Sequence, residues 1–280
     1  MSTTDTRNYS FEFFPPKTPQ GVEKLQQTRE ELGRLKPAYF SVTFGAGGST
    51  QEGTLEVVSS IQQAGFEAAP HLSCIGSTQN TIRAILGRYQ ELGIKRLVAL
   101  RGDMPSGTQG VGDFRYANEL IEFVRLTTGT HFHIEVAAYP EVHPQAKSPE
   151  ADLLNFKRKV DAGANSAITQ YFFSAAAYYR FVEDCRRIGI DIPIVPGIMP
   201  ITNYTQLARF SDLCGAEIPR WIRLRLKAYE DDRESLTAFG TEVVTQLCAD
   251  LLDNDAPGLH FYTMNQVTAT RTIWENLKLS

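Results

Sequence analysis

The chain has 280 residues, of which 42% are hydrophobic and 21% are charged, and its formal net charge is −4. This composition supports one large core and excludes a disordered protein, and the charge argues against a nucleic-acid partner, which requires a concentrated basic surface. The first residues lack the apolar stretch of a signal peptide, and no apolar run has the length of a membrane span. We therefore expect a cytoplasmic protein without a membrane partner.

The four cysteines lie far apart in the sequence, which fits neither a disulfide framework nor a Cys-x-x-Cys site.

Short runs rich in β-branched and aromatic residues alternate with helical periodicity along the chain. The predicted strands are Tyr9–Phe13, Tyr39–Phe44, Ala68–Ser73, Arg96–Leu100, His133–Tyr139, Ser166–Tyr171, Ile192–Ile198 and Leu259–Thr263. Helix signals agree with this alternation, since Ser148 and Pro149 fit the start of one helix and Gly163 fits its end. Eight strands alternating with helices favour an α/β protein with a closed, parallel (β/α)8 TIM barrel, and we expect residues 1–280 to form a single domain.

Polar residues recur near the carboxyl ends of these strands. They are Glu12, Thr43, His71, Arg101 with Asp103, Tyr139, Gln170, and Tyr262 with Asn265. In an α/β barrel these strand ends converge on one mouth, whereas an open sheet would spread them apart. The sequence therefore predicts a functional site at the mouth of the barrel.

Glu12 is the first candidate for chemistry at that mouth. Alternation in the run SFEFF places Phe11 and Phe13 on one face of the strand and Glu12 on the other, so that Glu12 points into the barrel. We expect partial burial to raise the pKa of this carboxyl towards the range of a general acid. The alternative is a salt-bridged glutamate with a purely structural role.

Three further patterns suggest ligand contacts, although each also fits an ordinary solvated segment. The turn Arg101-Gly102-Asp103 lets the backbone approach a ligand, and the glycine-rich run FGAGGST offers backbone amides to an anion. On the predicted helix after Ser148, the residues Asp152, Asn155 and Lys159 share one side as a polar strip, and Arg158 and Lys159 offer positive charge to a phosphate. The neutral side chains of His71 and Gln170 suit the edge of a heterocycle, and the alternative for His71 is a core histidine with satisfied hydrogen bonds. The sequence has no metal-binding histidine cluster and no Ser-His-Asp motif.

Several motifs together resemble the methylenetetrahydrofolate reductase family. They are FEFFPP at 11–16, SVTFGAGG at 41–48, AAPHLSCIG at 68–76, LRGD at 100–103, the long run AAYPEVHPQAKSPEADLLNFKRKVDAGANSAITQYFF at 137–173, and PIVPGIMPI at 193–201. The resemblance implies an eight-stranded barrel that binds FAD, takes hydride from NADH or NADPH, and passes it to 5,10-methylenetetrahydrofolate to give 5-methyltetrahydrofolate.

The resemblance also implies roles for individual residues. Glu12 would be the general acid that opens the five-membered ring of the folate, and Asp103 would tune the flavin and the folate by its negative charge. Residues on FAD-binding positions of the family are Thr43, Phe44, Ala46, His71, Arg101, Gly102, Asp103, Ala117, Tyr139, His143, Asp152, Asn155, Arg158 and Lys159. Substrate positions fall on Glu12, Gln170, Leu224 and Gln266, no metal is implied, and a homo-oligomer is the family expectation.

This sequence departs from the family pattern where substrates bind. Leu224 and Leu226 stand where a glutamine and an aromatic residue are common, and Gln266 stands where an arginine is common. Three other readings compete with the family assignment: a flavin barrel that oxidises an amine such as proline, a non-redox barrel such as a Schiff-base aldolase or isomerase, and a flavin-free binding protein. The absence of a lysine at the predicted strand ends disfavours the aldolase. The sequence leaves the choice between NADH and NADPH open, because it has no Rossmann motif.

Overall fold

The computed structural model describes residues 7–44, 51–102, 112–229 and 231–279. The strands are β1 (Asn8–Phe13), β2 (Tyr39–Val42), β3 (Ala68–Ser73), β4 (Arg96–Leu100), β5 (His133–Ala138), β6 (Ser166–Thr169), β7 (Ile194–Val195), β8 (Gly197–Ile198) and β9 (Gly258–Tyr262). The helices are α1 (Pro19–Gly33), α2 (Gln51–Gln63), α3 (Gln79–Glu91), α4 (Ala117–Thr128), α5 (Pro149–Asp161), α6 (Ala175–Arg187), α7 (Tyr204–Cys214), α8 (Arg220–Ala228), α9 (Arg233–Asp253) and α10 (Thr268–Asn276).

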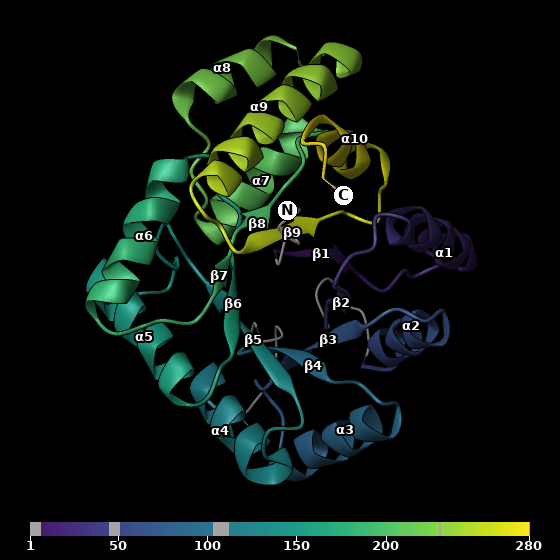
Figure 1. The fold of residues 1–280 in the computed structure, drawn as a ribbon, viewed down its shortest axis with the longest axis vertical. Coiled ribbons are helices and arrows are strands. Elements are labelled where there is room, and N and C mark those ends of the chain that lie inside the picture. Colours follow the sequence, from purple (N-terminus) through teal and green to yellow (C-terminus); the bar gives the residue numbers. More distant parts are fainter. Residues whose placement is uncertain (1–6, 45–50, 103–111, 230, 280) are drawn as a thin grey trace, which may run out of the picture.

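The strands form a parallel barrel inside a ring of helices (Figure 1). Their order is β7-β6-β5-β4-β3-β2-β1-β9-β8, and the two end strands are the halves of one interrupted strand. β7 pairs with β6 and β8 pairs with β9, so the two halves together close the barrel. The predicted TIM barrel is therefore confirmed, and its eight strand positions match the eight predicted runs.

The interruption in the seventh strand position falls at Pro196, which has no N–H to donate to a neighbouring strand. Its carbonyl oxygen still accepts a hydrogen bond from the His260 N–H at 2.9 Å. The next residue, Gly197, lies so close to β6 that a Cβ there would come within 2.1 Å of the Thr169 carbonyl oxygen. A glycine is thus required for the barrel to close at this point.

The alternation predicted for β1 is also observed. Phe11 and Phe13 are buried in the layer between the strands and the surrounding helices, and Phe13 stacks on Phe40 of β2 at 5.0 Å between ring centroids. Glu12 is directed to the other side of the sheet, into the barrel, where it meets His71 and His260. The predicted start of α5 is correct as well, because the Ser148 side chain accepts a hydrogen bond from the Ala151 N–H at 3.2 Å.

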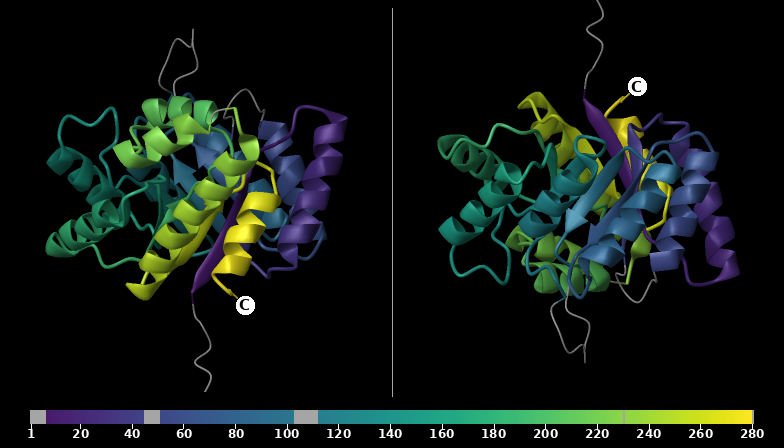
Figure 2. Two further views of the ribbon diagram at one scale, coloured as in Figure 1. Left: turned by 90° about the horizontal axis from the view of Figure 1, so that it is seen from above. Right: turned by 90° about the horizontal axis from the view of Figure 1, so that it is seen from below.

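The four cysteines are all free thiols, as the sequence predicts, and three of them are buried. Among the described residues, no helix has the length and apolar character needed to cross a membrane. Figure 2 shows the barrel from the side. β1 starts at one end of the molecule and runs towards the other end, where the parallel strands finish.

Candidate functional site

Three titratable side chains from β1, β3 and β9 meet inside the barrel. The Glu12 Oε2 atom lies 3.4 Å from His71 Nε2 and 3.5 Å from His260 Nε2. The second ring nitrogen of His260, Nδ1, lies 2.7 Å from the hydroxyl oxygen of Ser10, two residues before Glu12 on β1. The four side chains form a buried polar cluster, which we call the Glu12 cluster.

The backbone around Glu12 is held by the segment that follows β9. The Thr263 hydroxyl donates to the Glu12 carbonyl oxygen at 2.6 Å, and the Asn265 side chain bonds both the N–H and the carbonyl of Phe14 at 3.1 and 2.8 Å. These bonds fix the end of β1 after the last residue of its ladder. The Glu12 side chain is therefore presented by a rigid strand end rather than by a free loop.

The expectation of a raised pKa at Glu12 is wrong. Burial does disfavour the carboxylate and is the largest single influence, but the contacts with His260 and His71, and the positive charge of these rings when protonated, outweigh it. The net effect lowers the pKa of Glu12 to about 2. Sequence reasoning missed His260, although alternation in the run GLHFY places it on the same face as the predicted Tyr262.

This lowered pKa predicts an acid-sensitive fold. A carboxyl with a folded-state pKa of about 2 and an ordinary value of 4.5 contributes stability above pH 4.5 and loses it as the pH falls towards 2. We expect thermal melts between pH 6 and pH 3 to show a steeper loss of stability for the wild-type protein than for Glu12→Gln. Parallel pH profiles for the two proteins would contradict the assignment.

A second polar cluster lies where β4 and β5 end. The rings of Tyr139 and His143 meet edge to face at 4.5 Å, and the His143 N–H donates to Asp152 Oδ2 at 2.8 Å. Arg101, which directly follows β4, donates through Nη2 to Gln145 Oε1 at 2.6 Å. The structure thus brings Arg101, Tyr139, His143 and Asp152 into one neighbourhood.

Two features of the backbone place further predicted residues beside Arg101. Gly102 has φ +81, a conformation that favours glycine, and a Cβ there would lie 2.9 Å from the Ser73 side chain. Ala117 is the first residue of α4 and follows Tyr116. The carbonyl oxygens of Tyr116 and Arg101 each lie 3.7 Å from the Cys74 sulfur. Ala117 and Gly102 therefore lie next to Arg101.

The polar strip on α5 divides into two parts. The Lys159 ammonium lies against the barrel wall, where it donates to the Ala137 carbonyl at 2.5 Å. Desolvation is the main reason that the pKa of Lys159 is lowered to about 8, although Asp152 acts in the opposite direction. Arg158 and Asn155 are exposed and bond each other at 2.5 Å. Asp152 and Lys159 are thus bonded to β5 and the segment after it, whereas the bond between Arg158 and Asn155 stays on the helix.

The remaining predicted residues occupy the rim. Thr43 follows β2 and its N–H donates to the Phe13 carbonyl at 2.9 Å, and Phe44 beside it is half-buried. Gln170 follows β6, and its side-chain oxygen accepts from the Tyr171 N–H at 3.0 Å. Ala46 and Asp103 lie outside the described residues, as does most of the glycine-rich run.

The side chains of Leu224 and Gln266 are both exposed. Leu224 is 57% exposed on α8, whereas Leu226 is buried in the core. Gln266 is exposed after β9, and its backbone N–H donates to Thr263 at 2.9 Å. The two leucines thus differ in their surroundings, since Leu226 packs α8 on the core and Leu224 faces outward.

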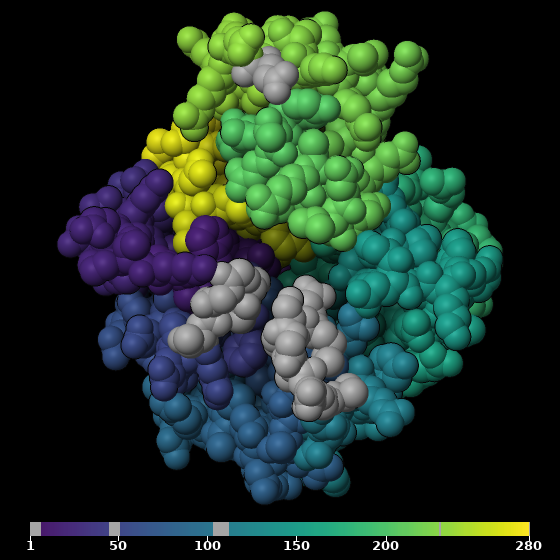
Figure 3. Space-filling view, turned by 180° about the vertical axis from the view of Figure 1, so that it is seen from behind, coloured from purple at the N-terminus to yellow at the C-terminus, as the bar shows by residue number. Residues whose placement is uncertain are grey.

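Seen from the end towards which the strands run, the segments that follow β1, β5 and β9 surround the centre of the face, together with α7 (Figure 3). Among the buried polar atoms at this end that have no hydrogen-bond partner within the described residues are His71 Nε2 and Thr43 Oγ1. His71 lies near Glu12 without the alignment of a hydrogen bond. Buried polar atoms are usually paired, so these two are suited to meet a bound ligand.

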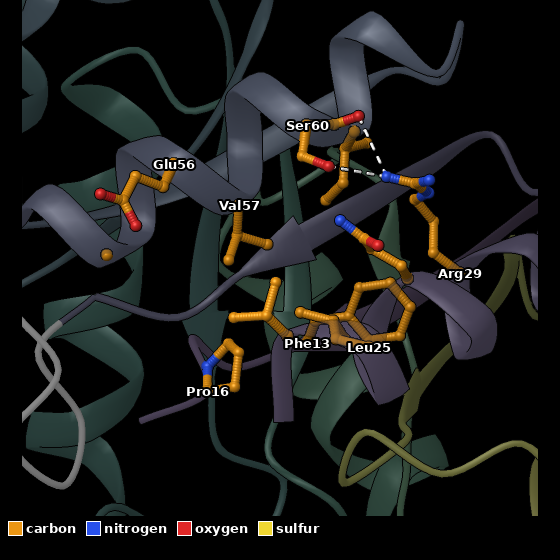
Figure 4. A pocket seen from close by; sticks show the side chains of 11 residues that line it. Phe13, Pro16, Leu25, Arg29, Glu56, Val57 and Ser60 are labelled. Atoms are coloured by element: carbon orange, nitrogen blue, oxygen red, sulfur yellow. Dashed lines mark hydrogen bonds between the residues drawn. The ribbon is translucent and has the colours of Figure 1, made fainter. Parts of the chain in front are cut away.

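A separate cavity lies outside the barrel, between α1 and α2 (Figure 4). It has a volume of about 100 Å³, and Phe13, Leu25 and Val57 form part of its apolar lining. Arg29 at its edge donates to the backbone and side-chain oxygens of Ser60 at 3.1 and 2.8 Å. The cavity is a packing gap between the two helices.

Within the described ranges, no group of three or more His, Cys, Asp or Glu side chains is arranged to hold a metal ion.

Comparison with known proteins agrees with this arrangement. The family model described as methylenetetrahydrofolate reductase matches residues 1–278. The 5,10-methylenetetrahydrofolate reductases of Salmonella typhimurium and Escherichia coli are each 42% identical over 271 residues, which cover 96% of this chain and 90% of theirs. Methylenetetrahydrofolate reductase (NADH) 1 of Arabidopsis thaliana is 39% identical over 97% of this chain and 48% of its own length.

A solved structure shares the fold. It is a protein from Clostridium thermocellum described as binding two copies of 5-methyl-5,6,7,8-tetrahydrofolic acid, with a TM-score of 0.68 and 16% identity, and the match covers 97% of this chain and 94% of that one. At this identity the likeness supports the barrel and nothing finer. Together with the family match over almost the full length, these findings show that the chain belongs to the methylenetetrahydrofolate reductase family.

Proposed function

We propose that this chain reduces 5,10-methylenetetrahydrofolate to 5-methyltetrahydrofolate, with FAD bound in the barrel mouth and NADH or NADPH as the electron donor. The observation that carries the proposal is the contact of Glu12 with two histidines inside the barrel of a chain of this family. FAD, when bound, supplies hydride transfer between two substrates that visit one site in turn. The protein must bind the substrates and deliver the proton.

Glu12 is the proposed general acid. Because its pKa is lowered to about 2, Glu12 is a carboxylate in the free protein and must take up a proton before it can protonate the folate. His71 and His260 are the side chains that contact it. Transfer to the nitrogen that leaves the one-carbon unit opens the five-membered ring. We propose that Asp103 supplies a negative charge beside the resulting cation, and that Gln170, Leu224 and Gln266 contact the substrates.

The residues at the mouth fit the chemistry of FAD. His71 Nε2 and Thr43 Oγ1, which lack a hydrogen-bond partner in the part of the chain that the structure describes, suit the polar edge of a heterocycle. Arg101 and Lys159 suit a pyrophosphate. Gly102 keeps the backbone beside Arg101 free of a side chain. The other proposed FAD contacts are Phe44, Ala46, Asp103, Ala117, Tyr139, His143, Asp152, Asn155 and Arg158.

A visible spectrum of the purified protein tests the proposal first. We expect flavin absorption that bleaches on anaerobic addition of NADH or NADPH and returns on addition of methylenetetrahydrofolate. Absence of flavin, even after incubation with FAD, would overturn the proposal. Bleaching without recovery would retain a flavoenzyme and reject the folate, and recovery with an amine-derived imine such as that of proline would favour the rival reaction.

Lys159 gives a pH-dependent test of the FAD site. Because its pKa is lowered to about 8, its positive charge is present below pH 8 and is lost as the pH rises above it. We expect Lys159→Met to weaken FAD binding by about tenfold to a hundredfold, the worth of one charge-assisted hydrogen bond. Fluorescence titration with FAD measures this affinity, and wild-type affinity should fall between pH 7 and pH 9.

The matched control for this test is Lys157→Met, which removes the same charge two residues away. Lys157 pairs with Asp161 along α5 at 2.5 Å and makes no described contact with the barrel strands. Equal losses of affinity in the two variants would show that net charge, not the Lys159 position, governs FAD binding.

A further inference from the structure

A chain of polar side chains runs through the interior of the barrel from Glu12 to the opposite end. Its members, in spatial order, are Glu12, His260, Ser10, Tyr39, Glu135, Ser166 and His133. Between the two ends, every member is at least 95% buried. A polar network of this kind is costly to bury unless each group is partnered, and here Ser10 is partnered by His260 and Tyr39 by Glu135.

The upper half of the chain links β1, β9 and β2. His260 Nε2 lies 3.5 Å from Glu12 Oε2, and His260 Nδ1 lies 2.7 Å from the Ser10 oxygen. Ser10 and Tyr39 are paired in the register of β1 and β2. Burial raises the pKa of the Tyr39 hydroxyl, and the Ser10 hydroxyl acts on it in the opposite direction. The imidazole of His260 and the hydroxyl groups of Ser10 and Tyr39 can each accept a proton on one side and release one on the other.

The lower half links β2, β5 and β6. The Tyr39 hydroxyl donates to Glu135 Oε1 at 3.4 Å, and Glu135 Oε2 accepts from the Ser166 hydroxyl at 2.5 Å. The Ser166 oxygen lies 2.6 Å from His133 Nε2, and Glu135 also lies 3.4 Å from that ring nitrogen. The His133 side chain is 38% exposed, so this half of the chain ends at solvent.

The two ends of the chain are far apart along the barrel axis. His133 is the first residue of β5, whereas Glu12 is next to last in β1, and the strands are parallel. His133 thus belongs to the end of the barrel opposite to the mouth. The positive charge nearest to the middle of the chain is Arg96, which bonds Glu135 at 2.6 Å and lies 4.5 Å above the Tyr39 ring.

We propose that this row of side chains is a proton path, along which Glu12 regains a proton from solvent at His133. The inference rests on the proposed function, because each turnover of that reaction consumes one proton at the folate nitrogen. Substrate and cofactor bound in the mouth would separate Glu12 from bulk water on that side. A path from the opposite end delivers the proton to Glu12 while ligands occupy the mouth.

The transfer balances in atoms and charge. His133 takes a proton from water, and each group along the path receives one proton and passes on another until His260 protonates Glu12. Glu12 then releases its proton to the folate nitrogen as the C–N bond of the methylene bridge breaks. The carbon accepts a hydride that comes ultimately from the nicotinamide donor, so one hydride and one proton enter for each methyl group formed.

Tyr39→Phe removes one hydroxyl from the middle of the path and keeps the ring. We expect the reaction with methylenetetrahydrofolate, followed by stopped-flow flavin absorbance, to slow by about tenfold or more, a part of the hundredfold or more that a positioned acid contributes. The reaction with NADH takes no proton from the path and should keep its rate. The matched control is Tyr178→Phe, which removes a buried hydroxyl that donates to Ile194 outside the path.

His133→Gln tests the entrance at the surface, where a substitution is least disruptive to folding. We expect a slower folate reaction that recovers when imidazole is added to the buffer, because a small diffusible base replaces the lost ring. His131→Gln, a histidine of the same segment that bonds Ile94 instead, is the control. Imidazole should rescue His133→Gln and leave Tyr39→Phe slow.

Two outcomes would overturn the proton path. One is an unchanged folate reaction in Tyr39→Phe, and the other is an equal slowing of both half-reactions, which indicates a structural role for the network. Failure of the wild-type protein to oxidise its flavin with methylenetetrahydrofolate would instead reject the proposed function, so the two failures are distinguishable.

Discussion

Replacement of Glu12 by glutamine is expected to slow the reaction with methylenetetrahydrofolate by about a hundredfold to ten-thousandfold, the range of general acid catalysis. Glutamine matches the size of the glutamate and still bonds a histidine, but it cannot release a proton to the folate nitrogen. The rate is read from the return of flavin absorption after mixing with methylenetetrahydrofolate.

The reaction with NADH is the internal control for this variant. It requires hydride transfer and no acid, so its rate should stay within a few-fold of wild type, and FAD should remain bound. If both half-reactions slowed equally, Glu12 would be a structural residue that shapes the site, which is the salt-bridged alternative. Asp103→Asn should slow both half-reactions, unlike Glu12→Gln, because the role proposed for that charge concerns the flavin as well as the folate.

The barrel was predictable from sequence because each strand is a short apolar run with its own stop signal. The run at Ile192–Ile198 was predicted as one strand, and Pro196 within it is the reason that the structure has β7 and β8 instead. The predicted strand at Tyr39–Phe44 was two residues too long, since Thr43 and Phe44 lie beyond the ladder and form the rim. Local patterns locate a strand but do not determine where its pairing ends.

The site was only partly predictable. Strand ends gave Glu12, His71, Arg101 and Gln170, because in a barrel such ends converge whatever their distance in sequence. The sign of the pKa shift at Glu12 was not accessible, since it depends on His260, which is 248 residues away and pairs only through the contact of β1 with β9. Burial was foreseen correctly, but its effect on the pKa is outweighed by partners that only the fold brings near.

Arg96→Met is expected to lower the free energy of unfolding by about 3–5 kcal/mol, the cost of leaving a buried partner charge unpaired. The Arg96 and Glu135 side chains are 14% and 3% exposed, and their charged atoms lie 2.6 Å apart. Methionine keeps most of the stem that packs in the barrel and removes the guanidinium, which also pairs with the half-exposed Glu67 at 3.1 Å. Denaturant unfolding followed by circular dichroism measures the difference.

The pH dependence of this difference identifies its cause. Burial raises the pKa of Glu135, but its hydrogen bond with His133 and the charge of Arg96 outweigh burial, so the pKa of Glu135 is lowered. Such a group contributes stability above its ordinary pKa of 4.5 and loses that contribution as the pH falls through the lower folded-state value. Wild type and Arg96→Met should therefore converge in stability at acid pH.

The surface pair of Arg187 and Asp184 supplies the control, because Arg187 is 67% exposed and its ion pair is screened by water. Arg187→Met should change stability by about 0.5 kcal/mol or less. A loss in Arg96→Met that is as small as this, or that persists undiminished in acid, would mean that Glu135 is held by its serine and histidine partners alone. In that case Arg96 would not be needed to hold Glu135 in the proton path, and the side chains from His133 to Glu12 would keep their positions.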